Sequence, residues 1–451
     1  MVNLTYGVSD RPPLPKLLLS ALQQILAILA ATIAVPAIIG NGMSQSAALF
    51  GAGVGTLVYL LLTKFKSPVF LGSSFAFLGS MGAAFAGAVT VGAGYIGLIL
   101  GALLAGLVYV VIALAVKFAG TDWINKLMPA IIIGPTVAII GLSLAGNAVG
   151  DLLGHPVDGV FTEFNYVSLV VGLVTLLTTI VVSVYGKRFL KMIPFIIGII
   201  AGYIVAAIFT GIGHAANIEG LKLINFSLFE NMKWVPDFTF VTAFNHFSDF
   251  KDAGEFFQYF GTVAVAYVPV AFVVFAEHIA DHKNLSSIIG KDLLTEPGLH
   301  RTLMGDGIGS LAGAFFGGCP NTTYGESIGC VAISGNASVW TIFTTSIMAI
   351  IFSFFAPFVT LLETIPACVM GGVCIALYGF IAVSGLKMLQ GIDLNDNRNL
   401  FVVSVILIAG IGGLVVSFGK ITITAVASAL ILGIVVNQLV NIKRKKENDN
   451  Q

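Results

Sequence analysis

Long apolar stretches, separated by short polar segments, follow one another along the whole chain. A helix needs about 20 apolar residues to cross a bilayer, and reading for such runs gives fourteen candidate spans. They cover residues 15–39, 44–62, 69–90, 95–117, 126–147, 166–185, 189–212, 260–282, 300–318, 319–335, 338–357, 358–386, 398–417 and 422–440. The pattern therefore predicts an all-α polytopic membrane protein.

The positions of the basic residues test this count. With the N-terminus in the cytoplasm and the spans alternating, every Lys and Arg falls on the cytoplasmic side except Lys222, Lys233, Lys251 and Lys420. Cytoplasmic loops are enriched in Lys and Arg, and a miscount by one span would invert every later loop. We therefore expect an even number of spans with both termini in the cytoplasm, and an external loop near 213–259.

Two of the spans are interrupted by small polar residues. Fourteen spans divide into two sets of seven, and an odd number per set would place the second set upside down relative to the first. Both interrupted stretches are third in their set: residues 71–77, Leu-Gly-Ser-Ser-Phe-Ala-Phe, and residues 320–327, Pro-Asn-Thr-Thr-Tyr-Gly-Glu-Ser. Matched interruptions in inverted repeats indicate the binding site of a secondary transporter. A pair of kinks packed between helices is the alternative interpretation.

Composition changes this picture little but excludes several classes of protein. Charged residues make up 10% of the 451 residues, hydrophobic residues make up 57%, and the mean hydropathy is +0.98. Soluble domains carry about 25% charged residues, so a soluble enzyme, a nucleic-acid-binding protein and a disordered chain are excluded. The net charge is zero and suggests no partner.

The four cysteines lie in apolar stretches without CxxC spacing, which predicts buried free thiols. The first residues do not resemble a cleavable signal peptide.

A few ionisable residues fall inside the predicted spans. Insertion of an Asp at a helix centre costs about 2.5–3.5 kcal/mol, so such residues indicate function. Glu277, His278 and Asp281 lie in the eighth span, Asp306 in the ninth and Glu326 in the tenth. A polar cluster that holds helices together is the structural alternative. No basic residue is predicted deep in a span, and a carboxyl group buried without a cation can exchange protons near neutral pH. The pattern suits a proton-coupled carrier of a neutral solute that bears N–H groups.

Other motifs in the chain predict no further chemistry. The glycine-rich stretches 51–55 and 305–309 do not follow a soluble strand, so we interpret them as close helix packing. No Walker sequence, metal-ligand pattern or nucleophile–base pair is evident. We therefore expect no catalytic residue, no metal and no cofactor other than a coupling proton. The basic run 443–446 is expected to anchor the topology, with lipid headgroup binding as a weaker option.

Several motifs resemble those of one transporter family. They are Asp10-Arg11-Pro12-Pro13, Phe70-Leu71-Gly72-Ser73-Ser74-Phe75-Ala76-Phe77, Ala276-Glu277-His278, Pro297-Gly298-Leu299-His300-Arg301, Asn321-Thr322-Thr323-Tyr324-Gly325-Glu326 and Val369-Met370-Gly371-Gly372-Val373. Through them the chain resembles the nucleobase–cation symporter family (the nucleobase–ascorbate transporter superfamily), over nearly its whole length. The 321–326 string is similar to the uracil permease branch rather than to the purine branches.

The resemblance implies a fold as well as a function. The family has fourteen segments in two inverted sets of seven, with short β-strands in segments 3 and 10 that meet at mid-membrane. It implies a core domain at 1–125 and 260–357, a gate domain at 126–215 and 358–441, an extracellular loop at 216–259 and a cytoplasmic tail at 442–451. It also implies proton-coupled import of uracil by an elevator-like movement, and a homodimer in the cell membrane. Within the same fold, a purine or xanthine carrier is the alternative; a channel or membrane-embedded enzyme is the alternative from another class.

The family's site residues can be transferred to matching positions here. The resemblance implies substrate binding by Glu277, Glu326, Phe75, Gly325, Tyr324, Ser74 and Tyr378. The candidates for proton coupling are Glu277, Asp281, Glu326 and His278. Carboxylates would accept from the N–H groups of uracil, and the backbone N–H groups of Phe75 and Gly325 would donate to its carbonyls.

The sequence departs from the family pattern at three places. Asp281 stands where the family has a His, with His282 one residue later. Gln24 also stands where a His is expected, and Ile333-Ser334-Gly335 replaces Ile-Thr-Arg. Because Asp can titrate, proton coupling remains compatible with Asp281 in place of the His.

Overall fold

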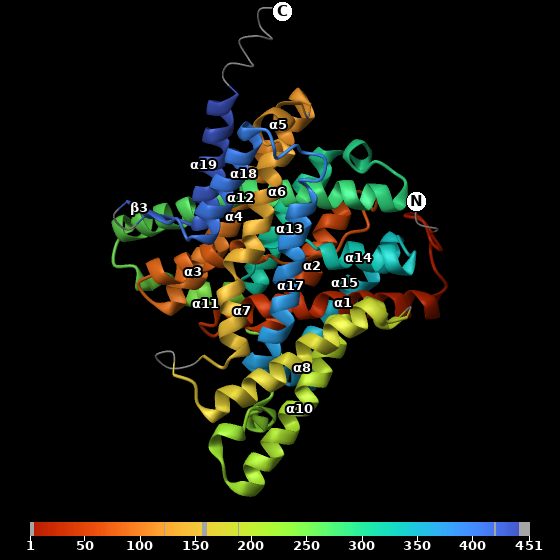
Figure 1. The fold of residues 1–451 in the computed structure, drawn as a ribbon, viewed down its shortest axis with the longest axis vertical. Helices are drawn as coiled ribbons and strands as arrows, with labels where there is room; N and C mark the ends of the chain where they lie inside the picture. Colours follow the sequence, from red (N-terminus) through yellow and green to blue (C-terminus); the bar gives the residue numbers. More distant parts are fainter. Residues whose placement is uncertain (1–3, 121, 156–159, 188, 419–420, 442–451) are drawn as a thin grey trace, which may run out of the picture.

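The chain folds into a large helical assembly, shown in a computed structural model (Figure 1). The structure describes residues 4–120, 122–155, 160–187, 189–418 and 421–441. The first half contains α1 (Leu14–Ile39), α2 (Gln45–Leu62), β1 (Leu71–Ser73), η1 (Phe75–Phe77), α3 (Leu78–Gly87), α4 (Val91–Ala119), α5 (Asp122–Leu127), α6 (Ala130–Ser143), α7 (Ala145–Leu152), α8 (Glu163–Tyr185), α9 (Phe189–Met192) and α10 (Pro194–Ala216).

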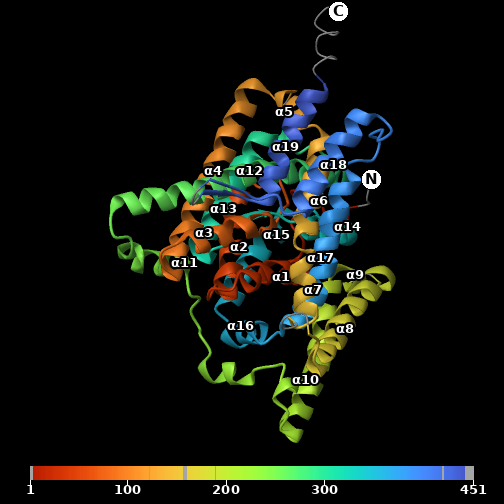
Figure 2. The ribbon, with the colours of Figure 1, turned by 60° about the vertical axis from the view of Figure 1, so that its left-hand side comes forward.

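A long connection leads from this half to the next. It contains η2 (Glu219–Leu221), η3 (Phe226–Asn231), α11 (Thr239–Asn245) and η4 (Phe247–Asp249). Figure 2 shows it running along one side of the molecule, from the end that holds α10 towards α11. The connection therefore occupies the region where an external loop is predicted.

The second half also begins with two long helices, a short strand and a shorter helix. It contains α12 (Ala253–Ile289), η5 (Leu294–Gly298), α13 (Leu299–Gly317), β2 (Asn321–Thr323), α14 (Gly325–Ser334), α15 (Val339–Ser353), α16 (Ala356–Glu363), α17 (Ala367–Lys387), α18 (Asn397–Ile411), β3 (Val416–Phe418), β4 (Ile421–Ile423) and α19 (Ala425–Val440). Within the described residues, eight helices are long and apolar enough to cross a membrane, or nine if the bent pair α15–α16 is one span. The chain is therefore a multi-pass membrane protein.

The helices pack into two groups. In the first group, α2 packs against α13 and α15, and α4 packs against α3, α12 and α13, with α1 beside α2 and α15. The strands β1 and β2, the short helix η1 and helix α14 belong to this group, because they contact α1, α2, α12 and α13. In the second group, α17 packs against α6, α7 and α8, α9 and α10 lie beside α8, and α18 packs against α6 and α19. The two groups meet where α1 and α12 contact α10, α17, α6 and α19. These two sets are called the first and the second helix group below.

Glycines allow the closest helix contacts in the first group. A Cβ atom on Gly309 of α13 would lie 2.7 Å from the carbonyl oxygen of Gly55 on α2, and one on Gly305 would lie 2.9 Å from the ring of Tyr59. Gly51 faces the backbone of Gly313 in the same way. The two glycine-rich stretches are thus confirmed as helix-packing surfaces. The four cysteines are confirmed as buried free thiols.

The structure differs from the predicted spans at two places. The predicted span 358–386 is two helices, because residues 356–363 form α16 and Pro366 precedes α17; proline lacks the N–H that a continuous helix needs. The predicted spans 398–417 and 422–440 are helical only in α18 and α19, and β3 pairs with β4 between them. Gly412 and Gly413 end α18, and the β-branched residues that follow favour a hairpin.

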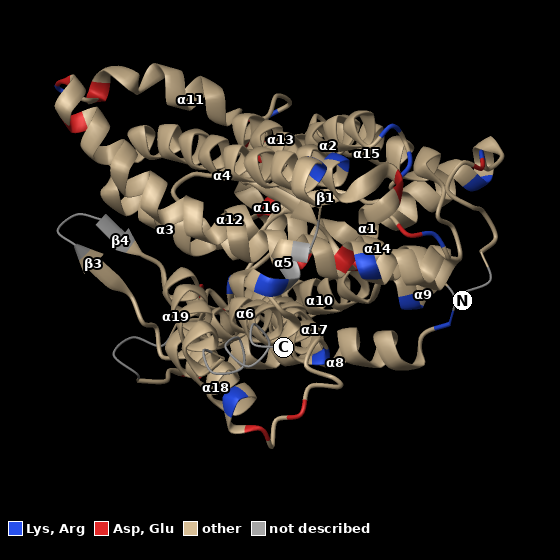
Figure 3. Ribbon diagram, turned by 90° about the horizontal axis from the view of Figure 1, so that it is seen from above, with Lys and Arg blue, Asp and Glu red and all other residues tan. Residues whose placement is uncertain are grey.

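Charged residues are distributed unevenly over the molecule. Figure 3 shows basic residues near the N-terminus, α9 and α14, and acidic residues at the opposite edge beyond α11. The N-terminal segment is held at this basic end, because the Thr5 N–H donates to the Gly335 carbonyl (2.8 Å) just after α14. The predicted tail 442–451 lies outside the described residues.

Candidate functional site

The two interrupted segments meet inside the protein. β1 and β2 pair antiparallel, with Leu71 opposite Thr323 and Ser73 opposite Asn321. The Tyr324 hydroxyl donates to the Ser73 carbonyl (2.7 Å), and the Ser74 N–H donates to the Pro320 carbonyl (2.9 Å). The N–H and C=O groups of extended backbone at membrane depth need hydrogen-bond partners within the protein. Here the paired strands provide partners for each other.

A helical segment begins directly after each strand. η1 starts at Phe75 and α14 starts at Gly325. The first N–H groups of a helix have no partner within the helix, and the helix dipole favours electronegative atoms there. The strand pair therefore places two sets of backbone donors side by side.

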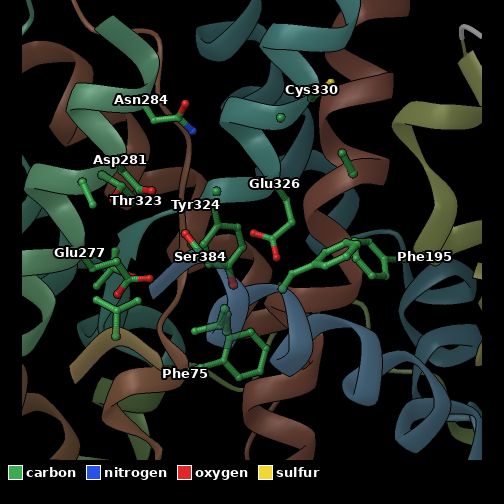
Figure 4. Close-up of a pocket in the computed structure, with 18 of the residues that line it drawn as sticks. Phe75, Phe195, Glu277, Asp281, Asn284, Thr323, Tyr324, Glu326, Cys330 and Ser384 are labelled. Carbon is green, nitrogen blue, oxygen red and sulfur yellow. Dashed lines mark hydrogen bonds between the residues drawn. The ribbon is translucent and has the colours of Figure 1, made fainter. Parts of the chain in front are cut away.

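A cavity of about 310 Å³ opens in front of these helix starts, between the two helix groups. The first group contributes Phe75, Glu277, Asp281, Tyr324 and Glu326 to its wall. Figure 4 shows Glu277 and Glu326 on two sides of the space, with Phe75 at one end. The second group contributes Val137 and Ile140 from α6, Phe195 from α10, and Phe380, Ile381 and Ser384 from α17. The cavity thus combines apolar walls with a few carboxylates and backbone donors, as small-molecule sites do.

One face of α12 supplies a polar stripe to the cavity. Glu277, Ala280, Asp281 and Asn284 all line it, and residues three, four and seven positions apart share one side of a helix. Glu277 and Asp281 are partly accessible, and Asn284 is exposed. The predicted shared face of Glu277 and Asp281 is therefore confirmed.

The cavity leads towards the basic end of the molecule. Its lining includes Lys191 of α9, Ile333 at the end of α14 and Met388 just beyond α17. Lys191 and Ile333 are exposed, and α14 ends beside the N-terminal segment. A solute in the cavity would therefore exchange with the side that holds the N-terminus.

Asp281 is tied to the strand pair. The Thr323 hydroxyl donates to Asp281 Oδ2 at 2.7 Å. In the described part of the chain, no ion pair joins Glu277, Asp281 or Glu326 to a Lys or Arg. The three carboxyl groups at the cavity thus lack a basic partner.

His278 and His282 face away from the cavity, into a separate polar network. His278 Nδ1 lies 2.7 Å from Asp306 Oδ2, and its Nε2 lies 3.0 Å from the Thr302 hydroxyl. His282 Nε2 lies 2.7 Å from the Tyr59 hydroxyl. Both histidines are fully buried. Asp281, and not the neighbouring His282, is therefore the titratable residue that α12 presents to the cavity beside Glu277.

The predicted site residues do not all lie at the cavity. Phe75, Glu277, Asp281, Tyr324, Gly325 and Glu326 line it, whereas Ser74, Tyr378 and His278 are absent from its wall. Tyr378 lies directly behind Phe75, with the two rings edge to face at 5.4 Å.

Gln24 contacts α14 and stands at a position where the resemblance implies a His. Its amide nitrogen lies 2.5 Å from the Ser327 hydroxyl oxygen, and that oxygen accepts from the Phe70 N–H at 3.2 Å. These contacts join α1, α14 and the residue before β1. Gln24 therefore positions the start of α14 without reaching the cavity.

Several cavity residues were not singled out by the sequence. Thr323 belongs to the 321–326 string, and Asn284 continues the α12 stripe seven residues after Glu277, so both carried a signal. Phe195, Ser384 and Lys191 come from the second group, where no motif marks them. Among the described residues, no group of three or more His, Cys, Asp or Glu side chains could hold a metal ion.

Comparisons with known proteins show which family the chain resembles. The profile described as Permease family matches residues 15–418. The uracil permease of Bacillus caldolyticus is 39% identical over 435 residues, covering 95% of this chain and 93% of the relative. The uracil permease of Bacillus subtilis (strain 168) is 38% identical over 461 residues, covering 99% and 97%. The transmembrane domain of the cyanobacterium bicarbonate transporter BicA has a TM-score of 0.62 at 16% identity, covering 97% of this chain and all of that one.

The fold and the cavity define a membrane transporter. The chain belongs to the permease family, within the nucleobase–ascorbate transporters, as its motifs indicate. This membership confirms the interpretation of a transporter rather than an enzyme. The similarity to the BicA domain extends to the fold alone.

Proposed function

We propose that this protein imports uracil together with protons. The observation that carries the proposal is the cavity at the paired strands, where Glu277 and Glu326 face the same space as the starts of η1 and α14. Uracil alternates two N–H donors with two C=O acceptors around its edge. Ionised carboxylates accept hydrogen bonds, and backbone N–H groups donate them, so both kinds of group on the solute find partners.

The aromatic wall supports a planar solute. Phe75 lies at the strand end, and Phe195 and Phe380 line the opposite wall. An aromatic face buries a flat ring favourably. The relatives named uracil permease share 38–39% of their residues with this chain, and this supports uracil over a purine or xanthine.

Proton coupling rests on the carboxyl groups. Glu277, Asp281 and Glu326 line one cavity without a Lys or Arg ion-pair partner in the described part of the chain. Bringing a negative charge to such a site is unfavourable, so a proton that binds there would favour movement of the loaded site through the membrane. Asp281, which stands where the resemblance implies a His, takes part in proton coupling, and no cofactor other than the proton is needed.

The two helix groups suggest how the cavity changes sides. We infer that the first group is the core domain and the second the gate domain, with fourteen segments as two inverted sets of seven. The core would slide past the gate and carry the site with it. With the N-terminus in the cytoplasm, the cavity faces inward, because it leads to the end that holds the N-terminal segment. The protein would act as a homodimer in the cell membrane, which mass measurement in lipid nanodiscs tests.

Equilibrium binding tests the choice of solute. Titration of the purified protein with radiolabelled uracil should give saturable binding that unlabelled uracil displaces. Displacement by xanthine but not by unlabelled uracil would favour the purine alternative. Absence of saturable binding to protein that remains monodisperse would contradict the proposal.

A further inference from the structure

A second cavity, of about 490 Å³, lies between the same two helix groups. The first group lines it with Ala34 and Ala37 of α1 and Gln45 of α2. The second group lines it with Asn147 of α7 and with Met370 and Cys374 of α17, among others. Like the first cavity, it therefore lies at the interface that must rearrange during transport.

The two cavities occupy successive levels of α1 and α17. On α17, Met370 and Cys374 line the second cavity, whereas Phe380 and Ser384 line the first. A helix rises 1.5 Å per residue, so Cys374 and Phe380 are separated by about 9 Å along the axis. On α1, Ala27 lines the first cavity and Ala34 lines the second.

An aromatic layer of Phe75 and Tyr378 lies at the stretch of α17 between the residues that line the two cavities. Tyr378 lies between the two levels of α17 and is 3% exposed, and its ring meets Phe75 edge to face at 5.4 Å. Phe75 belongs to the first helix group and Tyr378 to the second. Relative movement of the groups would therefore open this layer and join the cavities.

The second cavity carries amide groups suited to a nucleobase. The Gln45 side-chain oxygen is buried and has no hydrogen-bond partner within the described residues. Leaving a buried acceptor unsatisfied costs about 1–3 kcal/mol, which a ligand donor would relieve. The exposed amide of Asn147 adds both donors and an acceptor. Asp151 and His155 pair at 2.7 Å on the same wall, so this carboxylate already has a partner.

We propose that the second cavity is an entry site, which holds a neutral solute with adjacent N–H and C=O groups on Gln45 and Asn147 before the Tyr378–Phe75 layer opens. The inference rests on the proposed function, because uracil is the solute. It assigns to the cavity a binding step distinct from binding at Glu277 and Glu326.

Reporter thiols can distinguish the two sites. In a chain with its four native cysteines replaced by Ser, Ala37→Cys places a thiol at an exposed position of the second cavity. In a separate chain, Gly329→Cys places one in the first, where a Cβ meets nothing within 4 Å. The rate of alkylation by a polar maleimide is measured with and without saturating uracil. We expect uracil to slow both thiols at least threefold.

Variants at each site should separate the two effects. In a uracil titration, Glu326→Gln should raise the uracil concentration that half-protects the first-cavity thiol at least about tenfold and leave that of the second unchanged. Asn147→Leu or Gln45→Leu should do the reverse, and Gln258→Leu, an exposed amide on α12, should change neither. Protection confined to the first cavity, or the same rise for both thiols in Glu326→Gln, would overturn the entry site while leaving uracil binding intact. Protection of neither thiol would instead overturn the proposed function, and the entry site with it.

Discussion

The Thr323 hydroxyl donates a 2.7 Å hydrogen bond to the Asp281 carboxylate, joining strand β2 to the polar face of α12. This contact links a titratable group directly to the strand pair at which the solute is proposed to bind. A change in the protonation of Asp281 would therefore alter its hydrogen bond to Thr323, which is the last residue of β2 and precedes Tyr324.

Replacement of Asp281 should separate coupling from binding. Asp281→Asn keeps an oxygen that can accept from Thr323 but cannot exchange a proton. We expect uracil affinity within about threefold of the parent and a loss of stimulation by a pH gradient, measured as initial uptake rates. Thr323→Val is the matched variant that removes the hydrogen bond and keeps the carboxyl group. Unchanged pH dependence in Asp281→Asn would show that Asp281 is structural.

Glu277 and Glu326 should both contribute to the affinity for uracil. Glu277→Gln or Glu326→Gln replaces a charge-assisted hydrogen bond with a weaker one, since bonds to charged groups contribute about 1.5–3 kcal/mol against about 1 for neutral pairs. We predict a rise in the Kd for uracil of at least about tenfold, or about 1.4 kcal/mol, by equilibrium binding. Glu363→Gln, on α16 and outside this cavity, is the control. A glutamate variant with parental affinity would lose its assigned role.

Glycine at position 325 should be needed for uracil binding but not for the stability of the fold. A Cβ atom there meets no protein atom within 4 Å, although the residue lines the cavity. Gly325→Ala should therefore leave the melting temperature unchanged or slightly higher, because Ala favours a helix by about 0.5–1 kcal/mol over Gly. Uracil binding should weaken at least tenfold as the methyl group enters the cavity. Gly261→Ala, also in open space, should retain binding; a Gly325→Ala protein with parental affinity would place the solute elsewhere.

Gly309 should show the opposite behaviour. Its Cβ would lie 2.7 Å from the Gly55 carbonyl oxygen and from Leu71, and added volume in a packed core costs about 1–3 kcal/mol. Gly309→Ala should lower the melting temperature in detergent and reduce the yield of monodisperse protein. The open-space variant Gly261→Ala should melt like the parent. A stable Gly309→Ala protein would indicate that α2 and α13 lie further apart than described.

Much of the helical arrangement was accessible from the sequence. The apolar runs and their breaks located most helices, because a membrane helix must be apolar over its whole length. The end of α18 and the β3–β4 hairpin were not predicted, since the residues of a short β-branched hairpin are as apolar as a helix end. The predicted break between residues 357 and 358 lies near the 82° bend between α15 and α16, but a separate short helix α16 was not predicted.

The site residues that lie close together in the sequence could be predicted. Glu277 and Asp281 are four residues apart on a helix, so local geometry placed them on one face. Glu326 was indicated by its position in an interrupted span, whereas Gly325 was indicated by the family resemblance. Phe195 and Ser384 come from helices far away in the sequence, and only tertiary packing brings them to the cavity. Tyr378 illustrates the same limit, because its place behind Phe75 depends on how the two helix groups meet.

Uptake of radiolabelled uracil into proteoliposomes with an imposed inward proton gradient tests the central claim most directly. We predict accumulation above the equilibrium level, lost when a protonophore collapses the gradient and competed by unlabelled uracil more strongly than by xanthine. Uptake of equal rate and extent with and without the gradient would contradict proton-coupled import.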